Sequence, residues 1–418
     1  MPRLSSGLIL PGIVRASSNV RTELTTAAAI APEPGEALRV DLLVAEGDAV
    51  AQGQPLMRDH NHPGLALVAP MAGRVARIEV NPGRRLAQLV LYHEPAGDRH
   101  RHDIDTAESD AAALRVLLQG TGLWRALRSR PFGRVPRPDE TAAALFVMAC
   151  DSRPGAVPAD QALTGRTEDL LRGLGALARL GAGSVFFCAA AELDTPALPQ
   201  GIRRLVVGPL HPQGLAGTQI HRHHPARAEA PVWDIAAEDV ADLGALLASG
   251  YLAETRLISL SGDALRETHL VRCQPGADLR GLARPWVRPG PHEVFSGSLL
   301  DGRAAHWLGP RDRQATFLLR VPETGARHWF RRALERVARN SPIIPTVALD
   351  QAFGGNLPAA PLVRALASGD VEAFTRLGGL SMVEEDVALA DYATGARPRL
   401  AGQLRAMLAR IAAEEGAA

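Results

Sequence analysis

The stretch Ala144-Leu145-Phe146-Val147-Met148-Ala149 decides the fold class of the middle of this chain. An apolar run of this length, without a polar interruption, is typical of a strand that is buried on both faces of a sheet. A helical pattern over Asp160–Leu180 follows it, and a second apolar run covers Ser184–Cys188. This alternation of strand and helix predicts an α/β layer fold with a mostly parallel sheet.

The alternation of strands and helices continues after Cys188, whereas the segments before and after this part of the chain have different patterns. We expect two more strands and a helix over Leu205–Val207, Arg256–Leu260 and Glu238–Ser249. The first hundred residues instead hold short apolar runs between Gly and Pro turn signals, which predicts β structure. Short strands return after residue 262, and helices dominate from Arg331. We therefore predict four domains, over residues 1–100, 101–262, 263–330 and 331–418, and the third resembles a β-grasp domain.

Composition excludes several classes of function. The 418 residues carry 46 basic and 45 acidic side chains, a net charge of +1, which argues against a nucleic-acid partner. The chain contains no lysine, which excludes Schiff-base catalysis, a P-loop and a biotin or lipoyl attachment site. The cysteines Cys150, Cys188 and Cys273 form no C-x-x-C pair, which argues against iron–sulfur and Cys-based zinc sites. We expect no metal.

The absence of a long apolar segment bears on location. No stretch approaches the ~18 apolar residues that a membrane-spanning helix needs. The apolar run near the N-terminus is broken by Pro11 and Gly12 and is too short for a signal peptide. We expect a cytoplasmic protein that other chains hold at a membrane if it works there.

A glycine-spaced segment near the N-terminus suggests the fold of the first domain. The spacing of Gly47, Gly53 and Gly73 around Ala69-Pro70-Met71-Ala72 resembles the biotinyl/lipoyl-type barrel-sandwich hybrid. In carriers of that fold the hairpin tip presents the modified lysine. Here the tip is Pro70-Met71-Ala72, so the resemblance implies the fold without the carrier function.

The segment Gly120-Thr-Gly-Leu-Trp-Arg125-Ala-Leu-Arg128-Ser-Arg130-Pro-Phe132 is rich in arginine. In position it resembles the part of the NADH- and flavin-binding subunit of respiratory complex I where a glycine-rich loop wraps the flavin phosphate. Glycines are needed where backbone must touch phosphate, and here bulky side chains replace them. The resemblance implies a flavin-type Rossmann-like fold that holds no FMN. A basic surface helix whose arginines form salt bridges is the alternative.

Two further motifs have a plain and a functional interpretation. Gly173-Leu-Gly175-Ala-Leu-Ala178 fits a dinucleotide fingerprint, but the residues before it already have a helical pattern. Because N–H groups inside a helix are occupied, we interpret these small residues as helix packing rather than an NAD site. The loop 208–224 contains His221, His223 and His224. We interpret it as a glycine-punctuated docking loop, and a metal site at the three histidines is the alternative.

Other polar clusters have simple interpretations. We interpret the histidine pairs at 60/62 and 100/102 as solvated loop residues. The acidic run Glu384-Glu385-Asp386 is interpreted as a solvated start of a helix rather than a cation site. No G-x-S-x-G elbow is present, so we expect no serine hydrolase site and assign no catalytic residue.

Taken together, several segments resemble the A subunit of the sodium-translocating NADH:quinone oxidoreductases, as a divergent member or a paralogue. They include 7–11, 47–73, 122–132, 208–221, 295–302 and 380–389. The resemblance implies a barrel-sandwich hybrid, a Rossmann-like domain, a β-grasp (SLBB-like) domain and a helical C-terminal domain. It also implies a peripheral subunit without a redox cofactor, on the cytoplasmic face of the bacterial inner membrane against the membrane-embedded B subunit. NAD, FAD, FMN and Fe–S would then belong to partner subunits.

The resemblance further implies a role at a ubiquinone site near the contact with the B subunit. A quinone site needs an apolar slot with one or two hydrogen-bond donors. The candidates for the quinone or partner interface are Arg125, Arg128, Arg130, Phe132, His211, Gly214, Gly217 and His221. Two alternatives remain, an adaptor subunit of another ion-pumping electron-transfer complex and an autonomous FMN/NADH oxidoreductase.

Overall fold

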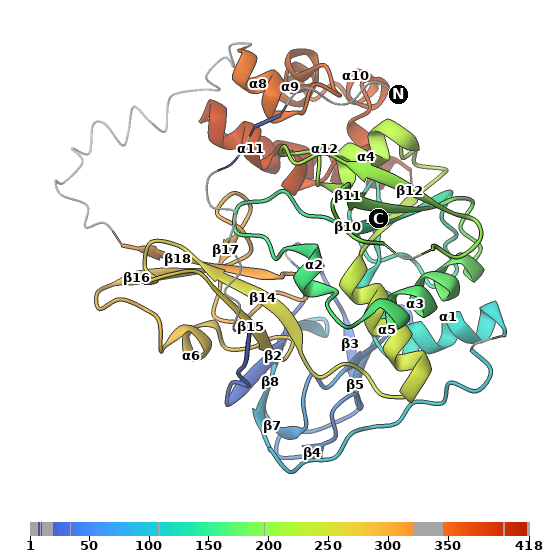
Figure 1. Ribbon diagram of the computed structural model, residues 1–418, viewed down its shortest axis with the longest axis vertical. Helices are drawn as coiled ribbons and strands as arrows, with labels where there is room; N and C mark the ends of the chain where they lie inside the picture. The colour runs from blue at the N-terminus through green and yellow to red at the C-terminus, as the bar shows by residue number, and fades with distance from the viewer. Residues whose placement is uncertain are drawn as a thin grey trace.

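The computed structural model describes residues 7–8, 10, 20–33, 35–107, 109–195, 197–320, 346–395 and 398–415. Strands of the first hundred residues lie at one end of the molecule and the C-terminal helices at the other (Figure 1). The α/β layer and a second large sheet lie side by side between them (Figure 1). The beginning of the segment predicted to be helical from Arg331 lies outside the described residues.

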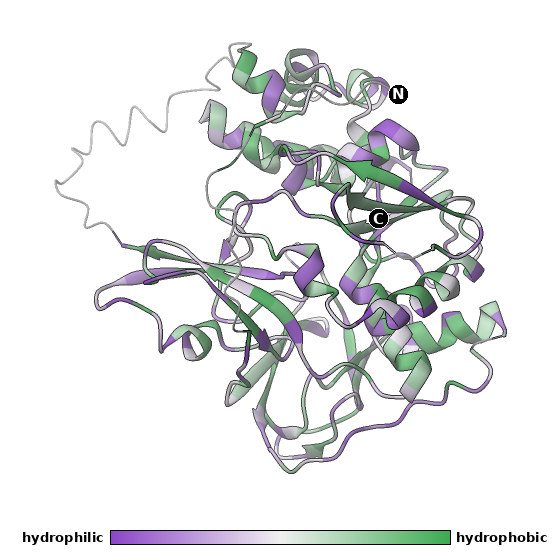
Figure 2. Cartoon of the chain, viewed as in Figure 1, coloured by the Kyte–Doolittle hydropathy of each residue, from purple (hydrophilic) through white to green (hydrophobic). Residues whose placement is uncertain are grey.

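The α/β layer is built on a five-stranded sheet with the order β12-β11-β10-β13-β9. Its strands are β9 (Arg128–Arg130), β10 (Ala144–Ala149), β11 (Val185–Ala190), β12 (Ile202–Val207) and β13 (Val232–Ala236). All neighbours pair in parallel except β9, which runs antiparallel to β13. The central strands are apolar along their length (Figure 2). The predicted parallel α/β layer is therefore confirmed.

Helices cover both faces of this sheet. On β10, Leu145 and Val147 face one core together with α1 (Ala111–Gly120), α3 (Thr167–Arg179) and α5 (Ala237–Ser249). Phe146 faces the opposite core, to which α4 (Ala216–His223) contributes Ile220. Successive side chains of a strand point to opposite faces of the sheet, and both faces are buried here. The stretch 144–149 therefore has no polar position.

The long helix predicted over 160–180 is in fact two helices. A short α2 (Ala159–Ala162) and α3 (Thr167–Arg179) are separated at Gly165, whose φ is 73°. A positive φ is costly for most residues, and glycine takes it readily, so the chain turns here instead of continuing the helix. Gly173 lies inside α3, which confirms its interpretation as a packing residue. A Cβ on Gly173 would lie 2.0 Å from the carbonyl oxygen of Val240 in α5.

The first hundred residues form two small sheets packed around one core. The sheets have the orders β2-β8-β7-β4 and β3-β5-β6. Their strands are β2 (Ala27–Ile30), β3 (Val40–Leu42), β4 (Ala49–Val50), β5 (Pro55–Asp59), β6 (Ala66–Val68), β7 (Gly73–Asn81) and β8 (Arg85–His93). The tip at Met71 is buried, and the Gln274 amide lies 3.6 Å from its sulfur. The hairpin that carriers expose is thus packed against the neighbouring sheet.

A six-stranded sheet with the order β1-β15-β14-β18-β16-β17 forms the third unit. Its elements are β1 (Arg21–Thr22), β14 (Arg256–Ser261), β15 (His269–Cys273), β16 (His292–Ser296), β17 (Arg303–Ala304) and β18 (Gln314–Leu319), with the helix α6 (Leu279–Ala283) beside them. The alternation of the sequence groups β14 with the α/β layer, but β14 pairs with β15 and β18. Strand periodicity alone does not say which sheet a strand joins.

Helices make up the described part of the chain after residue 345. They are α8 (Val347–Ala352), α9 (Ala359–Ser368), α10 (Val371–Arg376), α11 (Glu384–Thr394) and α12 (Leu400–Glu414). The apolar residues of α12 are buried in the shared core of these helices, with Leu404, Leu408 and Ile411 among its members. Phe132 from the arginine-rich segment belongs to the same core, so this segment connects the α/β layer to the helical unit.

His102 corrects one prediction of the sequence. It is 9% exposed rather than solvated, and it lies between Gly53 of the first domain and Gly250 of the α/β layer. Burial and the neighbouring His100 lower its pKa from 6.5 to about 4. The polar sequence around His100 and His102 does not indicate this contact, because only His102 of the pair is enclosed.

We expect the stability of the chain to fall as the pH drops from about 6.5 towards 4. A histidine with a lowered pKa in the folded state binds its proton more tightly in the unfolded chain, so acid favours unfolding. The shift of His102 corresponds to about 3 kcal/mol of the free energy of unfolding. Denaturant unfolding at several pH values measures this loss. The His102→Phe variant should show a shallower dependence, and an unchanged slope would contradict the assignment.

Candidate functional site

Two side chains of the arginine-rich segment, Arg128 and Arg130, lie next to the C-terminal helices. Strand β9 pairs antiparallel with β13, so that Arg128 lies opposite Asp234 and Arg130 opposite Val232. Arg128 donates to Asp234 Oδ2 from two of its nitrogens, at 2.9 and 3.1 Å. Arg130 donates from Nε to Asp234 Oδ1 at 2.8 Å. One aspartate on the sheet therefore holds two arginines of the neighbouring strand.

The first turn of α11 completes this cluster. Arg130 Nη1 donates to Asp386 Oδ2 at 2.6 Å and to the backbone carbonyl of Ser381 at 2.9 Å. Glu385 accepts from Arg128 at 2.6 Å and from Arg130 at 3.1 Å. The Arg130 side chain is fully buried. We call Arg128, Arg130, Asp234, Glu385 and Asp386 the ion cluster. It joins the α/β layer to the helical unit.

The ion cluster shifts the pKa values of its carboxyl groups in different directions. Burial opposes ionisation of Asp234, but Arg128 and Arg130 outweigh it and hold the pKa below its ordinary value. The same balance holds the pKa of Glu385 far below its ordinary value. For Asp386, burial prevails over Arg130 and the pKa is raised. Asp386 is therefore the member whose charge is least well compensated.

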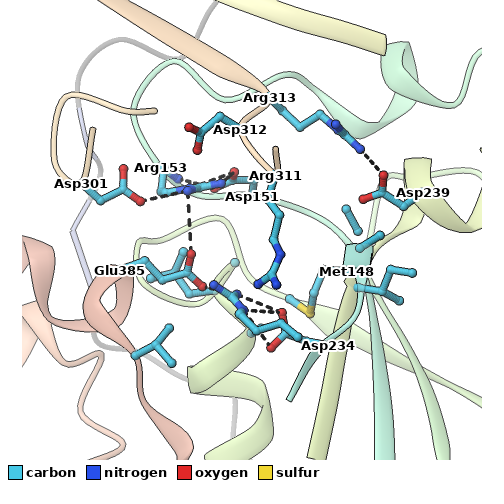
Figure 3. A pocket seen from close by; sticks show the side chains of 18 of the residues that line it. Met148, Asp151, Arg153, Asp234, Asp239, Asp301, Arg311, Asp312, Arg313 and Glu385 are labelled. Carbon is cyan, nitrogen blue, oxygen red and sulfur yellow. Dashed lines mark hydrogen bonds and ion pairs between the residues drawn. The ribbon is translucent and has the colours of Figure 1, made fainter. Parts of the chain in front are cut away.

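The ion cluster borders a cleft of about 390 Å³ at the carboxyl ends of β10 and β13. The chain runs from β10 to β11 and β12 on one side, and returns to β13 on the other side of β10. In α/β sheets such a point, where the strand order reverses, is the usual place of a ligand site. Arg153 crosses this cleft and pairs with Asp151 at 2.7 Å and Asp301 at 2.9 Å (Figure 3).

A second cavity of about 200 Å³ lies between the first domain, the α/β layer and the third sheet. Its lining is mainly apolar and includes Ile30, Leu67, Val68, Leu123 and Leu252. The polar and charged residues of its lining are Gln52, Thr121, Arg125, Asp239, Asp242, Thr255, Arg256 and Arg311. An apolar cavity with a few polar groups at its edge is the usual form of a small-molecule site.

The predicted site residues do not all lie together. Arg125 lines the second cavity and pairs with Glu36 at 2.7 Å, whereas Arg128 and Gly214 line the cleft. Arg128 and Arg130 belong to a strand and are enclosed, so the surface helix of the alternative is wrong for them, but the salt bridges that it predicts are present. The strand forms because its backbone pairs with β13 while both guanidinium groups meet carboxylates.

The remaining candidates lie around α4. The loop residue His211 is buried, and its Nδ1 is 3.1 Å from Ser152 Oγ. Gly217 is packed so closely that a Cβ would lie 2.4 Å from Asp386 Oδ1. His221 lies beside Gly378, where a Cβ would meet its ring at 2.2 Å. Gly217 and His221 thus border the ion cluster, and Phe132 packs beneath it in the helical core.

The acidic half of the ion cluster is absent from the residues that the sequence predicts for the site. It consists of Asp234, Glu385 and Asp386. Asp386 is buried and Glu385 is largely enclosed, whereas the run 384–386 suggests solvated side chains. The sequence did contain an indication of this cluster, because an arginine-rich and an acid-rich segment can form ion pairs with each other. The sequence does not show that they meet, since they lie about 250 positions apart. Arg311 and Arg313, which line the cleft, gave no signal at all.

No metal centre is found in the described part of the chain. Among these residues, no group of three or more His, Cys, Asp or Glu side chains could hold a metal ion. His221 faces Gly378, and the ring of His223 lies 6.3 Å from that of Phe186. The same residues include no helix that is both long enough and apolar enough to cross a membrane.

Comparison with known proteins agrees with this architecture. Residues 4–94 match the NqrA N-terminal barrel-sandwich hybrid domain, and residues 109–252 match the NqrA second alpha/beta domain. These two matches define the class, a multidomain chain in which an α/β domain follows a barrel-sandwich hybrid domain. Among solved structures, an NAD⁺-reducing [NiFe]-hydrogenase is similar at 16% identity and a TM-score of 0.35, over 74% of this chain and 66% of that one.

Curated relatives identify the family within this class. The A subunit of the Na(+)-translocating NADH-quinone reductase from Pseudomonas aeruginosa (strain UCBPP-PA14) is 32% identical over 90% of this chain and 91% of its own. The relative of the same name from Marinomonas sp. (strain MWYL1) is 30% identical over 99% and 100%. The chain belongs to the NqrA family, the A subunits of the Na(+)-translocating NADH-quinone reductase, which confirms the resemblance seen in the sequence.

Proposed function

We propose that this chain is a peripheral subunit of a membrane-bound, sodium-translocating NADH:quinone reductase. The observation that carries the proposal is the 32% identity to an NqrA protein over 91% of its length. The chain then lies on the cytoplasmic face of the bacterial inner membrane and contacts the membrane-embedded B subunit. NAD, FAD, FMN and Fe–S centres belong to the partner subunits. The α/β layer is Rossmann-like and the third unit is an SLBB-like β-grasp domain.

The cleft at the ends of β10 and β13 does not fit FMN, although the sequence resembles that of a flavin-binding protein. Its lining holds six arginines and nine acidic residues, an excess of negative charge that repels a phosphate dianion. Arg128 and Arg153 are paired with carboxylates and are not free to bind phosphate. This lining supports a docking role for the α/β layer rather than flavin chemistry.

The second cavity fits the head group of a quinone better than the cleft does. Its walls are mainly apolar. Arg125 of its lining contacts Glu36 through Nη2, and its other guanidinium N–H groups can donate to a quinone carbonyl oxygen. At about 200 Å³ it is smaller than the ~300–1,000 Å³ of typical ligand pockets, so it would hold the ring and leave the isoprenoid tail outside. This chain would then shape a ubiquinone site together with the B subunit.

The proposal is tested on the complex itself. A tagged form of the full chain, purified from its native membranes in mild detergent, should bring with it membrane proteins and NADH:quinone reductase activity. Recovery of the chain alone, or of a complex without quinone reductase activity, would contradict the proposal. A yellow lone chain with tightly bound flavin would favour the alternative of an autonomous FMN/NADH oxidoreductase.

The quinone site is tested on the same preparation with a photoreactive ubiquinone analogue. Labelled peptides should map to the walls of the second cavity, and the Arg125→Leu variant should lose most of this labelling. Arg74→Leu is the matched control, because Arg74 is an exposed arginine of the first domain that is also paired with a glutamate, Glu94. Equal labelling of both variants, or labelling that is confined to other chains of the complex, would refute the placement in this cavity.

A further inference from the structure

A small cavity lies where three parts of the chain meet beside the ion cluster. Its volume is about 10 Å³. Gly217, Thr218 and His221 of α4 form one wall, the segment around Asn356 after α8 forms a second, and Asp386 of α11 forms the third. The cavity therefore lies at the junction of the α/β layer with the helical unit.

Three residues of the cavity lining each carry a buried polar atom that has no hydrogen-bond partner among the described residues. These atoms are Asp386 Oδ1, His221 Nδ1 and Asn356 Nδ2. The Asp386 side chain is only 3% exposed, and its other oxygen is held by Arg130. A buried polar atom that makes no hydrogen bond costs about 1–3 kcal/mol, so three around one cavity call for a ligand.

The hydrogen-bonding capacity of these atoms defines the ligand. The unpartnered oxygen of the Asp386 carboxylate is an acceptor, and the unpartnered nitrogen of the Asn356 amide is a donor. His221 Nδ1 donates or accepts according to the tautomer of the ring. The site requires a small group that both donates and accepts hydrogen bonds.

We propose that one water molecule is bound in this cavity and bridges Asp386, His221 and Asn356. Water donates two hydrogen bonds and accepts up to two, so it can serve an acceptor on Asp386, a donor on Asn356 and either tautomer of His221. A cavity on the order of 10–15 Å³ holds one water, and buried waters typically make about three hydrogen bonds to protein. A monovalent cation fits less well, because it has no lone pair to accept a hydrogen bond from the Asn356 amide.

The water links the two units through the ion cluster. It hydrogen-bonds to the free oxygen of Asp386, whose second oxygen accepts from Arg130 and from the Val383 backbone N–H. Asp386 then has partners on both oxygens, which compensates part of the burial that raises its pKa. The bridge also fixes the His221 ring against Gly378, where no side chain could fit. The structure thus assigns to His221 and Gly217 a role in joining the two units.

A crystal structure of the full chain at high resolution tests the proposal. One density peak should lie about 2.7–3.2 Å from each of the three atoms. An empty cavity would refute the proposal. A second crystal grown in rubidium chloride separates water from a cation, since a rubidium anomalous signal at this position would also refute it.

Variants test the bridge in solution. Water-oxygen-17 relaxation dispersion detects long-lived internal waters, and the Asn356→Leu variant should lose one of them relative to wild type. Asn81→Leu is the matched control, because Asn81 is an exposed asparagine at the end of β7 and should keep all of them. The same number of long-lived waters in Asn356→Leu and wild type would overturn the assignment.

Discussion

Replacing Arg130 by methionine is expected to lower the free energy of unfolding by about 3–5 kcal/mol. Arg130 is fully buried and its guanidinium contacts Asp234, Glu385 and Asp386. Methionine fills part of the space but leaves buried carboxylates without their cation, which is far more costly than the loss of a surface pair. Chemical denaturation at neutral pH measures the change. The loss should shrink in acid, where the carboxyl groups can take up protons.

Arg376→Met is the control for this prediction. Arg376 pairs with Glu372 one helical turn away, and both side chains are more than 70% exposed. Such pairs contribute about 0.3–0.5 kcal/mol, so this variant should unfold almost like the wild type. Equal losses in the two variants would show that the ion cluster does not join the α/β layer to the helical unit in the folded chain.

The ion cluster also shows where prediction from sequence ends. The apolar run at 144–149 predicts its own strand because the period and burial of a strand are local properties. The meeting of Arg130 with Asp386 is not local, because it depends on how two units dock. The same limit explains His102, whose burial depends on the contact between the first domain and Gly250. Local polarity predicted solvent at both places and was wrong for the same reason.

The resemblance to a known family predicted parts of the domain organisation that local sequence patterns could not predict. The order of the first two domains followed from motifs in 47–73 and 122–132, and family matches over 4–94 and 109–252 confirm it. The candidate site was only partly recoverable, because the motifs named residues that pack around the ion cluster and not their acidic partners. A motif marks positions with a constrained environment. Only the fold shows whether that constraint serves a ligand or the docking of two units.

Gly173→Ala and Gly175→Ala should have opposite effects on stability, although both change a glycine of the same helix to alanine. A Cβ at Gly173 would lie 2.0 Å from the Val240 carbonyl oxygen, so α3 and α5 would have to separate. Overpacking of this kind costs about 1–3 kcal/mol or more. A Cβ at Gly175 would meet no atom within 4 Å, and alanine is favoured over glycine in a helix by about 1 kcal/mol.

Thermal unfolding of the two variants measures this difference, with Gly173→Ala expected below the wild type and Gly175→Ala at or above it. The pair also distinguishes helix packing from the dinucleotide fingerprint that the same residues resemble. A phosphate-binding turn would need both glycines, so both substitutions would then reduce NAD binding. Packing against Val240 involves only Gly173, so equal destabilisation by the two variants would contradict the close contact of α3 with α5 as the reason for this motif.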